Sequence, residues 1–158
     1  MTEDTWYFAY GSNLSMDRKE KRTGCIREAR VAHLPGYRLA FNKQGENGEV
    51  YANIMPADGD EVWGVIYRCN PEAMAKLDHC EGVDSGHYTR EQVTAITRSG
   101  DAVPAETYIA GEGHLCEEGR PSDRYLNCIL SGAKEHGLPA DYIRRVEAIA
   151  RPSPAAGC

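Results

Sequence analysis

The stretch from residue 62 to residue 67 constrains the fold most, because it reads as a strand with two apolar faces. Val62 and Ile66 would lie on one face, and Trp63 and Val65 on the other. A strand that is apolar on both faces is normally covered on both. The wall of a barrel with helices outside it meets that requirement. We therefore expect a curled sheet whose outer face is covered by helices.

Further strand signals occur on both sides of this stretch. The expected strands cover residues 5–10, 37–42, 50–55, 62–67, 88–97 and 103–110. Gly, Asn and Asp gather at residues 45–48 and at residues 58–60, which is typical of hairpin turns. Because the strands follow one another as a meander with helices inserted, the class is α+β with an antiparallel or mixed sheet.

Helix signals separate and follow the strands. The clearest helix would begin at Asn70 and Pro71, a preferred cap and a preferred first residue, and would end at Gly82. Three more are expected over residues 14–22, from Ser122 to Gly137, and from Pro139 onward. By helical spacing, the inward residues would be Ala73, Met74, Leu77 and Cys80 in the clearest helix, and Tyr142, Val146 and Ile149 in the last.

Length and charge limit the class of protein. The 158 residues suit one domain, residues 1–158, with a disordered Pro- and Ala-rich tail at about residues 151–158. A net charge of -6 argues against a nucleic-acid surface. The sequence has no apolar run of about 18 residues that would cross a membrane, and its acidic start lacks the features of a signal peptide. We therefore expect a cytoplasmic location.

Cysteines and histidines give no metal-binding pattern. The chain has 6 cysteines and 5 histidines, with no Cys-x-x-Cys pair and no His-x-x-x-His pair. A chain of this length folds without disulfides, so we expect reduced, mostly buried thiols.

The turn after the first strand is the first candidate site. Gly11, Ser12 and Asn13 follow Tyr10 and lead toward a short helix. Successive backbone N–H groups at such a turn form a concave anion site, where a substrate carboxylate could rest. An ordinary strand-to-helix turn explains the same residues, and spacing alone favours that simpler interpretation.

Glu81 is the second candidate, because it stands at the end of the helix that begins at Asn70. The negative end of a helix disfavours a charged carboxylate, and partial burial would raise its pKa, which suits proton transfer. A solvated surface acid explains the same residue, and without further information it is the simpler interpretation.

Three stretches together resemble the γ-glutamyl cyclotransferases. They are residues 7–14 (Tyr-Phe-Ala-Tyr-Gly-Ser-Asn-Leu), residues 77–88 around Glu81 and Gly82, and residues 121–139 with Tyr125. They occur in order and at compatible spacing over nearly the whole chain. The resemblance implies a small mixed β-barrel surrounded by helices, which agrees with the order of strands and helices above.

The resemblance also implies a reaction and roles for residues. The free α-amine of a γ-glutamyl group attacks its own γ-carbonyl, which releases 5-oxoproline and an amino acid or amine without a cofactor or metal. Glu81 matches the family's acid/base. The implied substrate-binding residues are Tyr7, Phe8, Ala9, Tyr10, Gly11, Ser12, Asn13, Leu14, Tyr88, Tyr108 and Tyr125. The expected partner is a small γ-glutamyl substrate, not nucleic acid or a membrane, and a homodimer is compatible with the sequence.

Two alternatives stay open. The same chemistry could remove a γ-glutamyl cap from a secondary metabolite or act on a γ-glutamyl amine, whereas the glutathione-specific branch is disfavoured because residues 10–14 depart from its usual turn. A non-catalytic small-molecule binding module could share the fold. The presence of Glu81 favours an enzyme, because non-catalytic relatives lack this acid.

Overall fold

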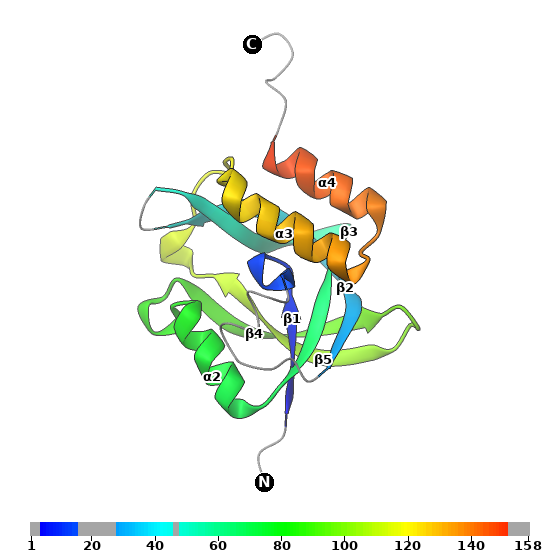
Figure 1. The fold of residues 1–158 in the computed structure, drawn as a ribbon. Helices are drawn as coiled ribbons and strands as arrows, with labels where there is room; N and C mark the ends of the chain where they lie inside the picture. Colours follow the sequence, from blue (N-terminus) through cyan, green and yellow to red (C-terminus); the bar gives the residue numbers. More distant parts are fainter. Residues whose placement is uncertain (1–3, 16–27, 46–47, 152–158) are drawn as a thin grey trace.

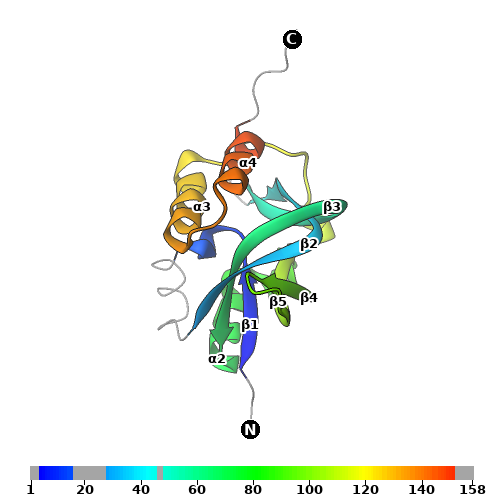
Figure 2. The ribbon, with the colours of Figure 1, turned by 90° about the vertical axis from the view of Figure 1, so that its right-hand side faces the viewer.

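Five strands form a closed barrel in the computed structural model, which describes residues 4–15, 28–45 and 48–151. They are β1 (Thr5–Ala9), β2 (Ala29–Gln44), β3 (Val50–Cys69), β4 (Tyr88–Thr97) and β5 (Ala102–Ala110). The order around the barrel is β1, β3, β2, β4, β5 (Figures 1 and 2). The pairs along that order are antiparallel, and β5 closes the barrel on β1 in parallel. The predicted α+β class with a mixed barrel is confirmed.

Strands β2 and β3 are longer than the sequence indicated, with 16 and 20 residues. The expected hairpin turn at residues 58–60 is wrong, because β3 runs through it as one strand. The pairing with β2 changes register there, from Pro35 opposite Glu61 to Tyr37 opposite Pro56. Gly59 takes a φ of +80° at this bulge, a conformation that glycine adopts without steric cost. The strand therefore bends here and does not reverse its direction.

The hairpin expected at residues 45–48 is confirmed. Gln44 pairs with Val50, and the Gly45 N–H donates to the Glu49 carbonyl oxygen at 2.8 Å. This hairpin joins the end of β2 to the start of β3, the two longest strands. It therefore brings residues of both strands to the same side of the barrel.

The helices begin and end where their capping residues predicted. They are α2 (Pro71–Cys80), α3 (Asp123–His136) and α4 (Ala140–Ala150), with single turns η1 (Ser12–Leu14), η2 (Val83–Ser85) and η3 (Glu112–His114). The Asn70 side chain accepts a hydrogen bond from the Ala73 N–H at 2.8 Å, and Ser122 accepts one from the Tyr125 N–H at 3.2 Å. In the described part of the chain, α3 and α4 lie on one side of the barrel and α2 on the other (Figure 1).

Two helix positions expected in the core are exposed. Cys80 is the last residue of α2 and is exposed. Ile149 is 36% exposed, and Ala150 is buried in its place. Residues four apart share a helix face, so the buried stripe of α4 continues from Tyr142 and Val146 to Ala150.

The expectation of mostly buried thiols is also wrong. Of the described cysteines, Cys69 is buried, Cys80 is exposed, and Cys116 and Cys128 are half-buried; Cys80, Cys116 and Cys128 are free thiols. Cys25, Cys158, most of the helix expected over residues 14–22 and nearly all of the tail lie outside the described residues.

Helix α3 packs directly on η1, which contains the candidate turn. A Cβ atom at Gly132 would lie 2.3 Å from the Leu14 carbonyl carbon and 2.5 Å from the Ser15 nitrogen. Only glycine therefore allows the two backbones to approach this closely. Ser12, Asn13 and Leu14 are buried, and the turn η1 lies directly beneath α3 (Figure 1).

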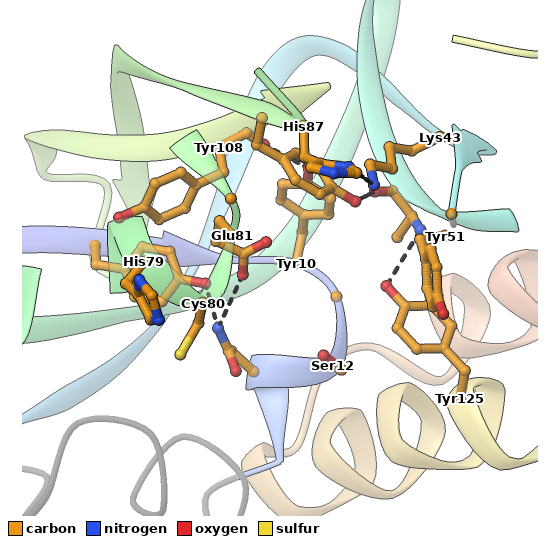
Figure 3. A pocket seen from close by; sticks show the side chains of 17 residues that line it. Tyr10, Ser12, Lys43, Tyr51, His79, Cys80, Glu81, His87, Tyr108 and Tyr125 are labelled. Atoms are coloured by element: carbon orange, nitrogen blue, oxygen red, sulfur yellow. Dashed lines mark hydrogen bonds between the residues drawn. The ribbon is translucent and has the colours of Figure 1, made fainter. Parts of the chain in front are cut away.

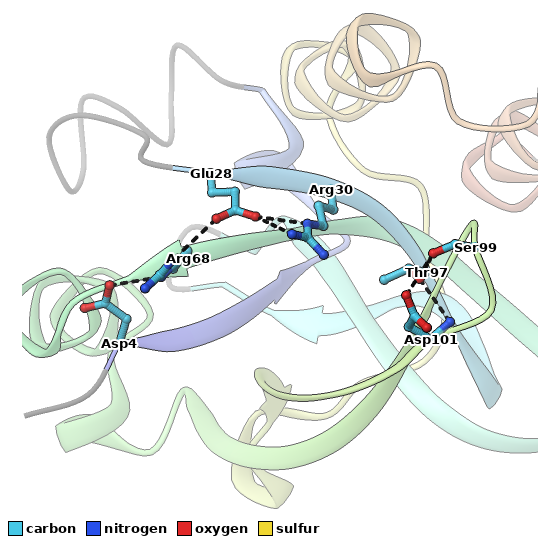
Figure 4. A network of polar contacts seen from close by, with 7 residues as sticks. All are labelled: Asp4, Glu28, Arg30, Arg68, Thr97, Ser99 and Asp101. Carbon is cyan, nitrogen blue, oxygen red and sulfur yellow. Dashed lines mark hydrogen bonds and ion pairs between the residues drawn. The ribbon is translucent and has the colours of Figure 1, made fainter.

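Ion pairs join strand ends on the surface (Figure 4). Arg68 near the end of β3 bonds to Asp4 at 3.1 Å and to Glu28 at 3.5 Å, next to the first residues of β1 and β2. Exposed pairs of this kind each contribute about 0–1 kcal/mol, so the apolar core supplies most of the stability. No helix among the described residues is long and apolar enough to cross a membrane.

Candidate active site

A cavity of about 530 Å³ brings most of the predicted site residues together. Its wall includes Tyr7, Tyr10, Gly11, Ser12, Asn13, Glu81, Tyr88, Tyr108 and Tyr125 (Figure 3). These residues come from β1, η1, the end of α2, β4, β5 and α3. A volume of this size is typical of a small-molecule site.

Three predicted residues do not line the cavity. Phe8, Ala9 and Leu14 are at most 1% exposed and belong to the hydrophobic core. The side chain of Phe8 points to the face of β1 opposite Tyr7, because side chains alternate along a strand. These residues hold the strand and turn in place from behind.

Asn13 links the turn to Glu81. Its side-chain amide donates to the Tyr7 hydroxyl oxygen at 2.9 Å and to Glu81 Oε1 at 3.5 Å. Its backbone carbonyl accepts a hydrogen bond from the Tyr67 hydroxyl at 2.9 Å. Asn13 is therefore held at both its backbone and its side chain.

The backbone of the turn is tight. The Leu14 N–H donates to the Gly11 carbonyl at 3.0 Å, and the Ser15 N–H donates to the Ser12 carbonyl at 3.1 Å. The N–H groups of Gly11, Ser12 and Asn13 come first in the turn, where no earlier carbonyl of the same turn can accept them. Gly11, Ser12 and Asn13 line the cavity.

Glu81 caps the C-terminal end of α2, as the sequence predicted. Its N–H donates to the Leu77 carbonyl at 2.8 Å, and Gly82 takes a left-handed φ of 64° that ends the helix. The half-buried carboxyl group faces the cavity beside Asn13 (Figure 3). The expected rise in its pKa stays a prediction.

Three tyrosine hydroxyl groups of the wall donate hydrogen bonds to other groups of the protein. Tyr10 donates to the Tyr108 carbonyl at 2.5 Å, Tyr108 donates to Asp78 at 2.7 Å, and Tyr88 donates to the Ala52 carbonyl at 2.8 Å. Burial, and then the nearby Glu81, raise the pKa of Tyr10 well above its usual value. Burial also raises the pKa of Tyr88 and Tyr108. These three tyrosines are therefore neutral at physiological pH.

Tyr125 reaches the hairpin from α3. Its hydroxyl oxygen accepts the Ala52 N–H at 3.2 Å, and its ring meets the ring of Tyr51 edge-on, with centroids 4.9 Å apart. Tyr125 thus connects the helix, the hairpin and the wall opposite Glu81 (Figure 3).

Sequence reasoning missed several residues of the wall. They are Lys43, Gly45, Tyr51, Ala52, His79, Cys80, Gly82 and His87. Lys43 is 5% exposed, and its ammonium lies 2.7 Å from His87 Nδ1. A lysine beside a hairpin signal resembles an ordinary surface residue, so no local pattern could have singled it out. Within the residues that the structure describes, no group of three His, Cys, Asp or Glu side chains could hold a metal ion.

Known proteins resemble this chain over almost its full length. The AIG2-like family model matches residues 61–146. Over 152 residues, the chain is 37% identical to a γ-glutamylcyclotransferase of Homo sapiens and 38% identical to one of Bos taurus, covering 93% of this chain and 79% of each relative. A solved γ-glutamyl cyclotransferase structure is 34% identical, with a TM-score of 0.86 over 99% of this chain and 93% of that chain. The chain belongs to the AIG2-like family and, within it, to the γ-glutamyl cyclotransferases.

Proposed function

We propose that this protein is a γ-glutamyl cyclotransferase that acts on small γ-glutamyl compounds and requires no cofactor. The α-amine of the γ-glutamyl group attacks its own γ-carbonyl carbon, the C–N bond to the leaving group breaks, and 5-oxoproline and an amine are released. The observation that carries the proposal is the meeting of Glu81 with the turn at residues 11–13 in one cavity, joined through Asn13.

Glu81 is the proposed acid and base. The α-ammonium must lose a proton before its nitrogen can attack, and the departing nitrogen must gain one. One carboxylate that lies near both nitrogens can accept the first proton and then donate it. The Asn13 amide at 3.5 Å orients the carboxylate toward the substrate, so that little reorganisation is needed during the reaction.

The turn is the proposed binding site for the substrate's α-carboxylate. The backbone N–H groups of Gly11, Ser12 and Asn13 are suited to an anion, and they can also stabilise the oxyanion that develops at the γ-carbonyl. Because the attack is intramolecular, correct orientation of the amine supplies much of the rate enhancement. Tyr10, Tyr88, Tyr108 and Tyr125 form an aromatic wall that holds the methylene groups of the substrate.

Release of 5-oxoproline is the test of this function. Purified protein is incubated with γ-glutamyl-L-alanine and with a panel of γ-glutamyl amines, and 5-oxoproline is measured by chromatography. We expect catalytic turnover on at least one member. A folded protein that binds these compounds and releases no 5-oxoproline would instead be a non-catalytic binding module on the same fold.

We also propose a cytoplasmic location, which the cysteines support. Cys80, Cys116 and Cys128 are free thiols, and free thiols persist in reducing compartments. Fractionation of cells that produce the protein would check the location. Assembly as a homodimer also stays a prediction, which light scattering on the full chain would check.

A further inference from the structure

A second charged side chain, Lys43, lies in the cavity wall at some distance from Glu81. Lys43 extends into the wall from β2 near the hairpin, and Figure 3 places it on the side of Glu81 away from Tyr108. Among the lining residues that the structure describes, it is the one lysine or arginine. The cavity therefore has a carboxylate toward its middle and an ammonium toward one end.

The ammonium of Lys43 is held in a fixed place. His87 Nδ1 lies 2.7 Å from Nζ, and the ring centroids of Tyr51 and Tyr88 lie 5.7 and 5.3 Å from it. Burying an ammonium is costly unless such groups compensate for the loss of water.

The backbone and the second histidine support this arrangement. Lys43 is paired with Tyr51 across the hairpin and forms a bridge to Leu115 on its other side. The His87 ring packs against the tilted ring of His114, with centroids 4.0 Å apart. A cation fixed in this way loses little conformational freedom when an anion binds, which increases its contribution to affinity.

The chemistry of the substrate identifies the anion. A γ-glutamyl amino acid has one carboxylate on the glutamyl side of the amide bond and a second on the leaving amino acid. The turn at residues 11–13 is suited to the first. We propose that Lys43, positioned by His87, binds the second, so that the enzyme selects leaving groups that carry a carboxylate. This inference rests on the proposed cyclotransferase activity and specifies its substrate class.

Two substrates that differ only in this carboxylate test the proposal. γ-Glutamyl-L-alanine releases alanine, and γ-glutamyl-ethylamide releases ethylamine, which is alanine without its carboxyl group. A hydrogen bond to a charged group is worth about 10- to 100-fold in binding. We therefore expect the wild-type kcat/KM to be about 10- to 100-fold higher for the dipeptide. In Lys43→Met this ratio should approach one, through loss of activity on the dipeptide alone.

Lys76→Met is the matched control. Lys76 lies on the outer face of α2, where 52% of its side chain is exposed, and its removal should leave both rates unchanged. If Lys43→Met does not fold, as judged by circular dichroism, Lys43→Gln and the wild-type preference provide the same test.

Each result has a distinct meaning. Equal kcat/KM values for the two substrates in the wild type would overturn the proposal while leaving the cyclotransferase activity established. An equal loss on both substrates in Lys43→Met would also overturn it, because Lys43 would then serve the glutamyl end or the fold. If the wild type released 5-oxoproline from neither substrate nor from the wider panel, the proposed function itself would fail.

Discussion

Replacing Gly132 by alanine should push helix α3 away from the turn that contains the candidate site. A Cβ atom at this position would lie 2.3 Å from the Leu14 carbonyl carbon and 2.5 Å from the Ser15 nitrogen. Because carbon atoms in contact normally lie ~3.5–4.0 Å apart, the two backbones must separate by roughly 1 Å. Both close atoms belong to the backbone, so a change of side-chain rotamer cannot relieve the clash.

The structure suggests two consequences of this separation. Overfilling a packed core costs about 1–3 kcal/mol, which lowers the Tm of a chain of this size by about 2–12 °C. A misplacement of about 1 Å in an active site can reduce the rate roughly 100-fold. Since η1 carries Ser12 and Asn13 into the cavity, we expect kcat to fall by about 10- to 100-fold.

Thermal unfolding followed by circular dichroism measures the Tm, and 5-oxoproline release from γ-glutamyl-L-alanine measures kcat. Gly113→Ala is the matched control, because a Cβ atom there would meet nothing within 4 Å and both values should stay at wild-type levels. A Gly132→Ala variant with wild-type Tm and kcat would refute the idea that contact between helix and turn positions the site.

Two further variants address neighbouring parts of the site. Asn13→Ala removes the amide that contacts Glu81 and Tyr7, so kcat should fall by about tenfold; a wild-type kcat would show that the carboxylate needs no orienting partner. Burial lowers the pKa of His136, so below about pH 6.5 the unfolded chain binds more protons than the folded chain, and the free energy of unfolding falls as the pH falls. In urea titrations between about pH 7.5 and pH 5.5, His136→Gln should weaken this decrease, and an unchanged pH dependence would count against the burial of a neutral ring.

The helix ends could be predicted because their signals are local. The side chains of Asn70 and Ser122 accept hydrogen bonds from the first N–H groups of their helices, and Pro71 has no N–H group to satisfy. Gly137 takes the left-handed conformation that ends α3. Each of these effects depends on residues within one turn of the chain, so the sequence contains them in readable form.

The lengths and pairing of the strands could not be read in the same way. Gly59 looked like a turn, because a glycine between two aspartates fits a hairpin as well as a bulge. The long pairing of β2 with β3 decides between them, and that pairing depends on residues far apart in sequence. Closure of the barrel likewise depends on the parallel pairing of β5 with β1.

The candidate site was predictable in part. The turn and Glu81 belong to recognisable motifs, and the structure places them at one cavity. Lys43 and His87 are 44 residues apart and meet only because β2, β4 and the hairpin converge. Burial of a lysine in this way is a property of the tertiary structure, which no local pattern reports.

Turnover by a Glu81→Gln variant tests the central claim most directly. Glutamine keeps the size of the side chain but cannot accept and donate the proton. The kcat for γ-glutamyl-L-alanine should therefore fall by about 100- to 10,000-fold. Calorimetry should still detect substrate binding close to that of the wild type. Glu72→Gln, on the same helix with 78% of its side chain exposed, should keep wild-type turnover. A Glu81→Gln variant that released 5-oxoproline at the wild-type rate would show that Glu81 does not move the protons.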